Sequence, residues 1–184
     1  MKKKVILLDI DGTLNNFQEY FISEFQKRYP ELIDPSNPPK SHIDIMNIDR
    51  QKGLALLQEP HFTEGMTPLR GAVKALHEME ARGHNVFFCT SLVTDHSDTL
   101  RDRVQWIGKW FGEKWMNRVI FAHDKTMVRG DFLVDDSPKK ARGILPPTWK
   151  YIAFDAEHNQ CDTCDYRIYD WDNLDMFFGI IEKD

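Results

Sequence analysis

The stretch Val5-Ile6-Leu7-Leu8, followed by Asp9-Ile10-Asp11-Gly12-Thr13, is the part of this sequence that decides the fold. Four consecutive apolar residues, two of them β-branched, are typical of a strand buried on both faces of a parallel sheet. Two carboxylates follow where that strand ends, and ligands of open α/β sheets bind outside the carboxyl ends of the strands. Asp9 and Asp11 are therefore candidate site residues, and Gly12 permits a sharp turn that brings backbone N–H groups toward an anion.

The two acids also have a simpler interpretation, because Asp-Gly often ends a strand in a solvated turn. Three further apolar runs, however, are followed by polar residues of the kind found in functional sites. In chain order these endings are Cys89-Thr90-Ser91, Lys125-Thr126 and Asp135-Asp136. Parallel strands joined by right-handed crossovers bring their carboxyl ends to one edge of a sheet. The four endings together therefore predict one functional site at that edge.

The ordered motifs D-x-D-G-T, T-S, K and D-D span residues 9 to 136, and the set resembles the haloacid dehalogenase superfamily of phosphohydrolases. Several stretches are similar to the narrower 5'(3')-deoxyribonucleotidase family: Pro68–Ala72, Cys89–Ser91, Trp106–Gly112, Asp124–Val128, Phe132–Asp136, Tyr151–Asn159 and Arg167–Trp171. The resemblance covers nearly the whole chain. It implies a Rossmann-like (haloacid dehalogenase-like) α/β fold with a cap, and an enzyme that hydrolyses phosphate monoesters.

The composition agrees with such an enzyme and excludes other classes. The chain has 184 residues, of which 41% are hydrophobic, enough to bury a substantial core in one domain with a modest insertion. No apolar run approaches the ~18 residues that a membrane-spanning helix needs, and the charged start lacks the apolar segment of a secretory peptide. We therefore expect a soluble, cytoplasmic protein with no membrane partner. A net charge of −5 argues against binding to duplex nucleic acid.

Alternating apolar runs and helical patterns predict an α/β fold, with a parallel sheet and helices on both of its faces. Helices are expected at 69–82 and 97–111, and strands at 5–8, 86–89 and near residues 119, 132 and 151. Gly83 and Gly112 stand where the two helices are expected to stop. Lys2-Lys3-Lys4 is interpreted as an ordinary solvated leader before the first strand.

A helical insertion is expected directly after the first strand. Four aromatic residues recur at helical spacing and predict a helix from Phe17 to Tyr29 whose apolar stripe is mostly core: Phe17, Tyr20, Phe21 and Phe25. A proline-rich segment at 34–39 ends this helix, and a shorter apolar stretch follows at 43–57. Residues 15–68 then form a small cap, as in the resembling family, while residues 1–14 and 69–184 form the core domain.

The chemistry follows from the charge of the substrate. A phosphate monoester is a dianion, and two unit charges about 4 Å apart already interact by roughly 4 kcal/mol at an effective dielectric of 20. A divalent metal between carboxylate and phosphate reverses the sign, and oxygen-only ligands suit Mg²⁺. We therefore expect Mg²⁺ as the cofactor and Asp9 as both metal ligand and nucleophile, forming an aspartyl-phosphate. The resemblance assigns the backbone carbonyl of Asp11 and the carboxylate of Asp136 as further metal ligands, with Asp135 supporting them.

The remaining catalytic roles fall to residues at the other strand ends. Asp11 is expected to donate a proton to the leaving oxygen and then to act as a base on water. Thr90 supplies a hydroxyl to the transferring phosphoryl group, and Lys125 offsets negative charge on Asp9 and on the phosphate. The predicted catalytic residues are thus Asp9, Asp11, Thr90 and Lys125.

The expected substrate is a small phosphomonoester, and the resemblance implies a nucleoside monophosphate. Gly12 and Ser91 are expected to contact the phosphate. Phe17 falls where the resembling family stacks a nucleobase, and Phe62 lies where its cap meets the phosphate end. Core packing is the alternative for both phenylalanines, since aromatic residues on a helical stripe are more often core than base platforms.

Other functions stay open at this point. Thr13 stands where the resembling family usually has valine, and Leu92–His96 stand where it usually continues with proline, so base and sugar preference are not decided. The same mechanism serves a sugar phosphate or a polynucleotide phosphate end. A nucleotide-binding protein with a vestigial site is an alternative of another class, although the intact acids and Lys125 count against it. A homodimer is a further expectation.

The cysteines give no sign of a disulfide framework, since only Cys89, Cys161 and Cys164 are present. Cys161 and Cys164 have the spacing of metal ligands, with His158 close by in the sequence, but no second pair completes a zinc site, so free thiols are expected. Cys89 does not belong to the cysteine phosphatase pattern C-x5-R, because Asp95 stands at the arginine position.

Overall fold

The computed structural model describes residues 2–91, 97–137, 143–160 and 163–183. The strands are β1 (Val5–Leu8), β2 (Asn85–Thr90), β3 (Val119–Phe121), β4 (Phe132–Asp135), β5 (Lys150–Phe154) and β6 (Tyr166–Ile168). The α-helices are α1 (Phe17–Arg28), α2 (His42–Ile48), α3 (Arg50–Leu57), α4 (Ala72–Ala81), α5 (Ser97–Phe111) and α7 (Leu174–Ile181). Short 3₁₀ helices are η1 (Pro30–Leu32), η2 (Phe62–Gly65), η3 (Glu113–Arg118), η4 (Lys125–Met127) and η5 (Glu157–Asn159).

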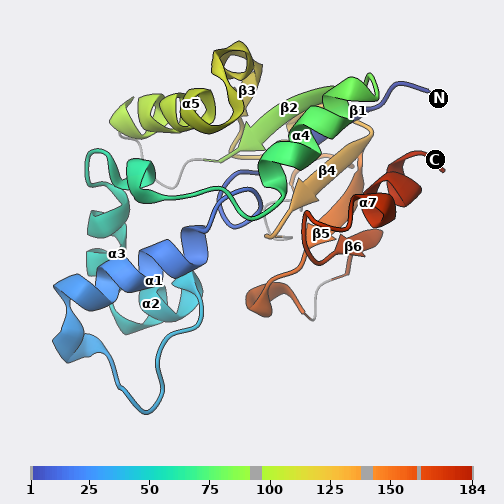
Figure 1. Ribbon diagram of the computed structural model, residues 1–184. Helices are drawn as coiled ribbons and strands as arrows, with labels where there is room; N and C mark the ends of the chain where they lie inside the picture. Colours follow the sequence, from blue (N-terminus) through green and yellow to red (C-terminus); the bar gives the residue numbers. More distant parts are fainter. Residues whose placement is uncertain (1, 92–96, 138–142, 161–162, 184) are drawn as a thin grey trace.

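The strands form one parallel sheet in the order β3-β2-β1-β4-β5-β6, with β1 between β2 and β4 (Figure 1). Leu8 pairs with Phe88 on one side and with Val134 on the other. All the strands point the same way, so their carboxyl ends lie at one edge. The predicted α/β fold with a parallel sheet is confirmed.

The β1 strand is buried on both faces, as its apolar run predicts. Ile6 and Leu8 belong to a core that includes apolar residues of α4, α5 and α7. Leu7 points to the opposite face, where it packs with Leu133 and Trp149. Alternate residues of one strand therefore enter two different apolar clusters, which explains why the run has no polar position.

The helix boundaries follow local signals. The helix α5 spans Ser97–Phe111, as predicted, whereas α4 begins at Ala72 and not at Leu69, because Gly71 has a φ of 83° and cannot belong to the helix. The sequence analysis did not predict β6 or α7. The strand β6 has 3 residues and α7 has 8, so both are shorter than the stretch over which a hydrophobic period is read.

The interpretation of the lysine leader is wrong for Lys4. This residue is buried, its backbone N–H donates to Nδ1 of His84 at 3.3 Å, and its ammonium lies 5.6 Å from the centre of the Phe132 ring. The carbonyl of Lys4 also accepts a hydrogen bond from the N–H of Asn85 at 2.8 Å. Lys4 therefore extends the β1–β2 pairing, whereas Lys2 and Lys3 are exposed.

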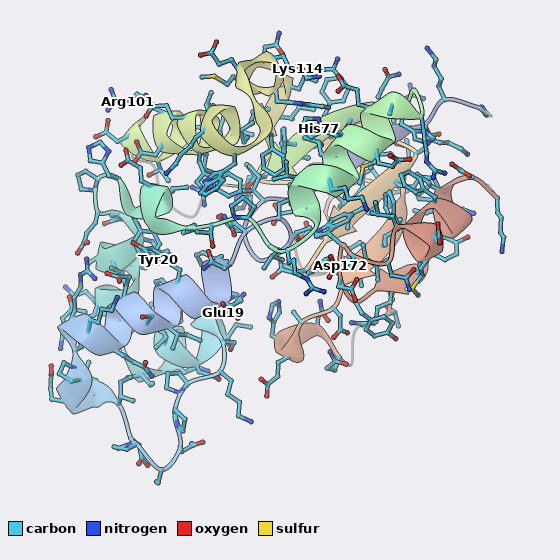
Figure 2. The ribbon with its side chains drawn as sticks, in the orientation of Figure 1. Glu19, Tyr20, His77, Arg101, Lys114 and Asp172 are labelled. Carbon is cyan, nitrogen blue, oxygen red and sulfur yellow. The ribbon has the colours of Figure 1, made fainter. Side chains whose placement is uncertain are left out.

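The segment between β1 and α4 has an apolar cluster of its own. It gathers to one side of the sheet, around α1, α2 and α3 (Figure 1). Its buried apolar residues are Phe17, Phe21, Phe25, Ile45, Leu56, Phe62 and Met66. Tyr20, labelled in Figure 2, packs at this cluster with its ring 5.1 Å from that of Phe62. The aromatic stripe predicted for the helix that became α1 therefore forms the centre of this cluster.

The chain leaves the sheet and returns to it at one place. The N–H of Asn16 donates to the carbonyl of Thr67 at 3.0 Å, and the N–H of Leu69 donates to the carbonyl of Leu14 at 2.8 Å. The two ends of the helical segment are therefore tied together beside β1. The division into a core and a cap of residues 15–68 stays a prediction. Among the described residues, no helix is long and apolar enough to cross a membrane.

Candidate active site

Three carboxylates meet at the carboxyl edge of the sheet. Asp9 follows β1, Asp135 ends β4 and Asp136 comes next, and all three are at most 3% exposed. One carboxylate oxygen from each lies within 4.8 Å of the others. The strand register causes this, because Leu8 and Val134 are paired and the N–H of Asp9 donates to the carbonyl of Val134 at 2.9 Å. Three buried acids this close need a cation among them.

Lys125 supplies one positive charge to this cluster. It opens η4 after β3, is fully buried, and its Nζ lies 2.5 Å from Oδ1 of Asp9 and 2.6 Å from Oδ2 of Asp135. Burial alone lowers the pKa of the Lys125 ammonium, but Asp135 and Asp9 outweigh it and raise that pKa above its ordinary value. Lys125 is therefore a permanent cation that bridges two of the three acids.

Asp136 is held from several sides. The N–H of Asp136 donates to Oγ1 of Thr13 at 3.0 Å, and its carbonyl accepts from Nδ2 of Asn159 at 2.8 Å. Nε2 of His158 lies 2.9 Å from the same carbonyl and 3.4 Å from Oδ2 of Asp136. Gly12, with a φ of 80°, packs so closely that a Cβ atom there would overlap Oδ2 of Asp136. The loop after β1 therefore requires glycine at this position.

Asp11 follows the same strand as Asp9, and its carboxylate contacts Asn15 and Arg103. Its Oδ1 accepts a hydrogen bond from Nδ2 of Asn15 at 3.1 Å, and its Oδ2 forms an ion pair with the guanidinium of Arg103. The N–H of Gly12 donates to Oδ1 of Asn15 at 3.1 Å. Arg103 belongs to α5 and is only 5% exposed. Asp11 is thus the acid through which the sheet edge contacts α5.

The hydroxyls predicted from the second strand are at the same edge. Thr90 is the last residue of β2, Ser91 follows, and both are buried. Cys89 precedes them, and burial raises the pKa of its thiol to about 12, against the opposing effect of Lys125. Cys89 therefore stays a neutral thiol, which is a poor nucleophile. This agrees with the missing cysteine phosphatase motif.

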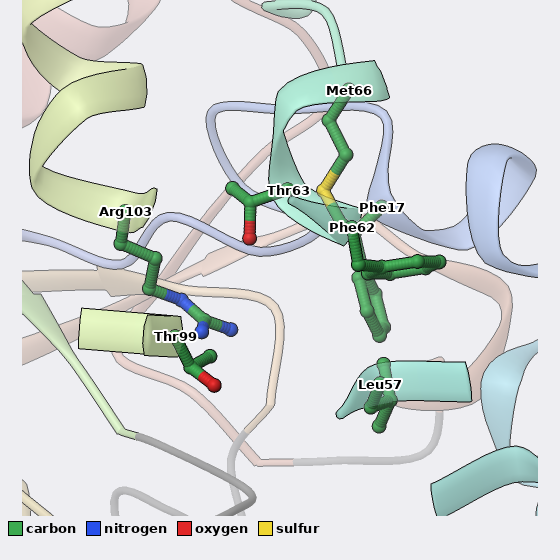
Figure 3. Close-up of a pocket in the computed structure, with 7 residues that line it drawn as sticks. All are labelled: Phe17, Leu57, Phe62, Thr63, Met66, Thr99 and Arg103. Atoms are coloured by element: carbon green, nitrogen blue, oxygen red, sulfur yellow. The ribbon is translucent and has the colours of Figure 1, made fainter. Parts of the chain in front are cut away.

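A narrow pocket lies between α5 and the helical segment. Figure 3 shows Arg103 and Thr99 of α5 on one side and the aromatic side chains on the other. Its lining residues are Phe17, Leu57, Phe62, Thr63, Met66, Thr99 and Arg103. The cavity volume is ≈ 20 Å³, room for about one water molecule. Phe17 and Phe62 thus line a common pocket while remaining packed against Phe21, at ring distances of 5.5 and 6.1 Å.

Sequence reasoning missed two residues of this site, Arg103 and His158. The sequence does contain a pattern that could have identified Arg103, because it precedes Trp106, Ile107 and Trp110 at helical spacing. A charged residue on an apolar helix face is usually paired with a buried partner of opposite charge. His158 was considered only as a neighbour of Cys161 and Cys164, whereas its ring contacts Asp136.

Two of the sequence predictions concern residues outside the described ranges. Leu92–His96, where the chain departs from the resembling family, lie outside the described residues, as does Cys161 of the candidate Cys161–Cys164 metal pair. Cys164 is described, and it is a half-buried free thiol.

The fold is that of haloacid dehalogenase-type hydrolases. A hydrolase of this type from Entamoeba histolytica superposes with a TM-score of 0.64 at 13% identity, covering 99% of this chain and 100% of that one. A structure described as a predicted phosphatase from Clostridium acetobutylicum superposes with a TM-score of 0.65 at 11% identity, with the same coverage of both chains, 99% and 100%.

Sequence comparison narrows this class to one family. Residues 3–183 match the family model of the 5' nucleotidase, deoxy (pyrimidine), cytosolic type C proteins, and the chain belongs to this family. A putative 5'(3')-deoxyribonucleotidase of Bordetella bronchiseptica is 33% identical over 174 residues, covering 92% of each chain. The mitochondrial 5'(3')-deoxyribonucleotidase of Homo sapiens is 29% identical over 163 residues, covering 84% of this chain and 72% of that protein. The protein is therefore a phosphoric monoester hydrolase, a nucleotidase with a small-molecule nucleotide substrate.

Proposed function

We propose that this nucleotidase removes the phosphate from deoxyribonucleoside monophosphates, with Mg²⁺ and through an aspartyl-phosphate on Asp9. The observation that carries the proposal is the convergence of Asp9, Asp135 and Asp136 around Lys125 at the sheet edge. A sheet edge of this kind attracts a cation and, through it, a phosphate. The deoxyribonucleotide substrate is the one named for the relatives from Bordetella bronchiseptica and Homo sapiens.

The donor set suits Mg²⁺. Carboxylate oxygens are the ligands of hard cations, and the three acids carry more negative charge than Lys125 neutralises. Asp9 and Asp136 would hold the ion, together with the backbone carbonyl of Asp11, while Asp135 stays with Lys125. When bound, Mg²⁺ would withdraw negative charge from the phosphate and so reduce its repulsion of Asp9.

The reaction has two displacement steps. A carboxylate oxygen of Asp9 attacks phosphorus and the bond from phosphorus to the ester oxygen breaks, while Asp11 donates a proton to that oxygen, so the nucleoside leaves as an alcohol. Water then attacks the phosphorus of the aspartyl-phosphate, Asp11 takes its proton, and Asp9 and inorganic phosphate are released. Thr90 and Ser91 would donate hydroxyl hydrogen bonds to the phosphoryl oxygens, with Lys125 beside them.

Arg103 adds a step that the sequence did not suggest. Its guanidinium pairs with Asp11 and also lines the pocket. An incoming phosphate dianion competes for that guanidinium, because arginine binds phosphate through two parallel hydrogen bonds. Once released, the Asp11 carboxylate would take up a proton from solvent, and it would give this proton to the leaving oxygen.

Substrate recognition would use the aromatic side of the pocket. Phe17 and Phe62 offer flat apolar faces to a nucleobase, and Gly12 would approach the phosphate with its backbone. A cavity of ≈ 20 Å³ is too small for a base, so residues 15–68, the predicted cap, would have to shift when substrate enters. A homodimer and a cytoplasmic location stay predictions.

Phosphate release from a panel of substrates tests the proposal. The panel contains deoxyribonucleoside and ribonucleoside monophosphates with 5' or 3' phosphates, sugar phosphates and a 5'-phosphorylated oligonucleotide, each with Mg²⁺ and with a chelator. We expect Mg²⁺-dependent turnover that is fastest on a deoxyribonucleoside monophosphate. Faster turnover of a sugar phosphate or the oligonucleotide would overturn the substrate, and nucleotide binding without turnover of any compound would indicate a vestigial site.

A further inference from the structure

A second group of metal-binding side chains lies away from the strand ends. His61 and Glu64 come from the segment that returns to the sheet, around η2, and Asp102 comes from α5. Their ligand atoms, one from each, lie within 4.8 Å of one another. Nδ1 of His61 is 2.7 Å from Oε1 of Glu64 and 3.9 Å from Oδ1 of Asp102. None of the three was a candidate site residue, and the proposed reaction uses none of them.

Asp102 makes this group different from an ordinary surface ion pair. Its side chain is only 4% exposed. Its Oδ2 accepts a hydrogen bond from the backbone N–H of His61 at 2.9 Å, whereas its Oδ1 is buried, has no hydrogen-bond partner among the residues that the structure describes, and faces the His61 ring. A buried carboxylate oxygen without a partner is costly, and it requires a cation or a donor next to it. The group therefore includes an acceptor that its own neighbours do not satisfy.

We propose that His61, Glu64 and Asp102 bind a divalent transition metal of the zinc type. Zinc accepts both imidazole nitrogens and carboxylate oxygens as ligands, whereas the nitrogen disfavours Mg²⁺. Zinc-to-ligand distances of about 2.0–2.2 Å place tetrahedral ligands about 3.3 Å apart, between the two distances observed at the His61 ring. His61 and Glu64 are 63% and 54% exposed, so an ion reaches the site from solvent and keeps a water at its fourth position.

The position of the site gives it a structural consequence. Phe62 and Thr63, which follow His61, and Arg103, which follows Asp102, all line the pocket. A metal held by His61 and Asp102 would join the two walls of the pocket one residue away from its lining. It would therefore fix the returning segment on α5.

Zinc binding to the full chain in excess Mg²⁺ tests this proposal. The Mg²⁺ fills the strand-end acids, and the zinc is titrated against a chromophoric chelator. His61→Asn keeps a residue that tolerates the left-handed backbone at this position, where φ is 64°, and Asp102→Asn keeps the acceptor for the His61 N–H. Glu64→Gln changes an exposed residue and leaves the fold unaffected. His77→Gln is the matched control, since His77 and Glu80 on α4 have the same spacing but belong to no group of potential metal ligands in the part of the chain that the structure describes.

We expect the wild type and His77→Gln to bind one more zinc ion than the three site variants. Loss of a direct ligand should weaken binding by more than the about 10–100-fold that follows loss of an outer-shell partner. Anomalous diffraction at the zinc edge should then give a peak between the three side chains. Equal zinc binding by Glu64→Gln, Asp102→Asn and the wild type, or a peak only at the strand-end acids or the cysteines, would overturn the proposal. The result does not depend on which substrate the enzyme hydrolyses.

Discussion

The strand-end site and the aromatic side of the pocket are built in different ways. At the strand ends, Lys125 is held by Asp9 and Asp135 at 2.5 and 2.6 Å, and each partner is fixed by the backbone register of the sheet. On the aromatic side, Phe17 and Phe62 are held by ring contacts at distances of 5.1 to 6.1 Å. Directional ion pairs on a hydrogen-bonded sheet tolerate little change, whereas apolar contacts allow repacking. In the proposed function, the sheet would therefore hold the reacting residues rigidly, and the aromatic side of the pocket would be the part that can adapt to the substrate.

Asp9→Asn should have the largest effect, and it tests whether the reaction depends on the strand-end site. The amide cannot attack phosphorus, so phosphate release should fall by about 10³-fold or more. The free energy of unfolding should change little, because Lys125 keeps its pair with Asp135 and one of the three clustered carboxylates loses its charge. Steady-state phosphate release and urea unfolding measure the two quantities. Wild-type turnover by this variant would show that Asp9 is not the nucleophile.

Lys125→Met tests the charge balance at the strand ends. It leaves Asp9 and Asp135 buried without their shared cation, and the free energy of unfolding should fall by about 3–5 kcal/mol. Lys114→Met is the control, since Lys114 pairs with Glu80 on the surface and is 59% exposed, so its loss should cost less than about 1 kcal/mol. Lys114 is one of the side chains labelled in Figure 2, where it lies on η3. Equal urea midpoints for the two variants would contradict the role given to burial.

Arg103→Gln tests the contact between Asp11 and α5. Loss of a charge-assisted hydrogen bond should lower kcat/KM by about 10–100-fold. Arg101→Gln changes an exposed arginine on the same helix that pairs with Asp98, and it should leave kcat/KM unchanged. If both variants had the kcat/KM of the wild type, the proposal that substrate draws Arg103 away from Asp11 would be wrong.

Phe17→Leu and Phe21→Leu test whether the aromatic side of the pocket binds substrate or serves packing alone. Both residues are buried in the same cluster, but only Phe17 lines the pocket. We expect Phe17→Leu to raise KM by about tenfold through lost stacking on the base, and Phe21→Leu to lower the free energy of unfolding by about 1–2 kcal/mol at unchanged KM. Similar KM values for both variants would mean that Phe17 serves only packing.

The smallest expected effect concerns Cys89 and pH. Its thiol has an ordinary pKa of 9.0 and a folded-state pKa of about 12, so the folded protein keeps a proton that the unfolded chain loses. The stability from this group is complete below pH 9.0 and is lost as the pH rises toward about 12. Cys89→Ala should show a weaker alkaline loss of stability in urea unfolding. Peptide mapping after alkylation near pH 8 should find Cys89 unmodified in the folded wild type.

Much of the site could be predicted because its residues follow apolar strands. Asp9, Thr90, Lys125 and Asp135 each stand at or just after a strand end, and a parallel sheet gathers such ends whatever the loops do. The helical cluster was only partly predictable. The stripe of Phe17, Phe21 and Phe25 marks a helix, but it does not reveal which ring faces a pocket.

The sequence alone therefore determined the buried central strand, the parallel sheet and the acids at its edge, because hydrophobic period and strand ends are local properties of the chain. Only the tertiary structure decided that Arg103 pairs with Asp11, 92 residues away, that His158 contacts Asp136, and that Asp102 faces His61. These contacts depend on how a helix or loop is placed against the sheet. That placement results from the packing of the whole core, so no local sequence pattern predicts which of these residues come into contact.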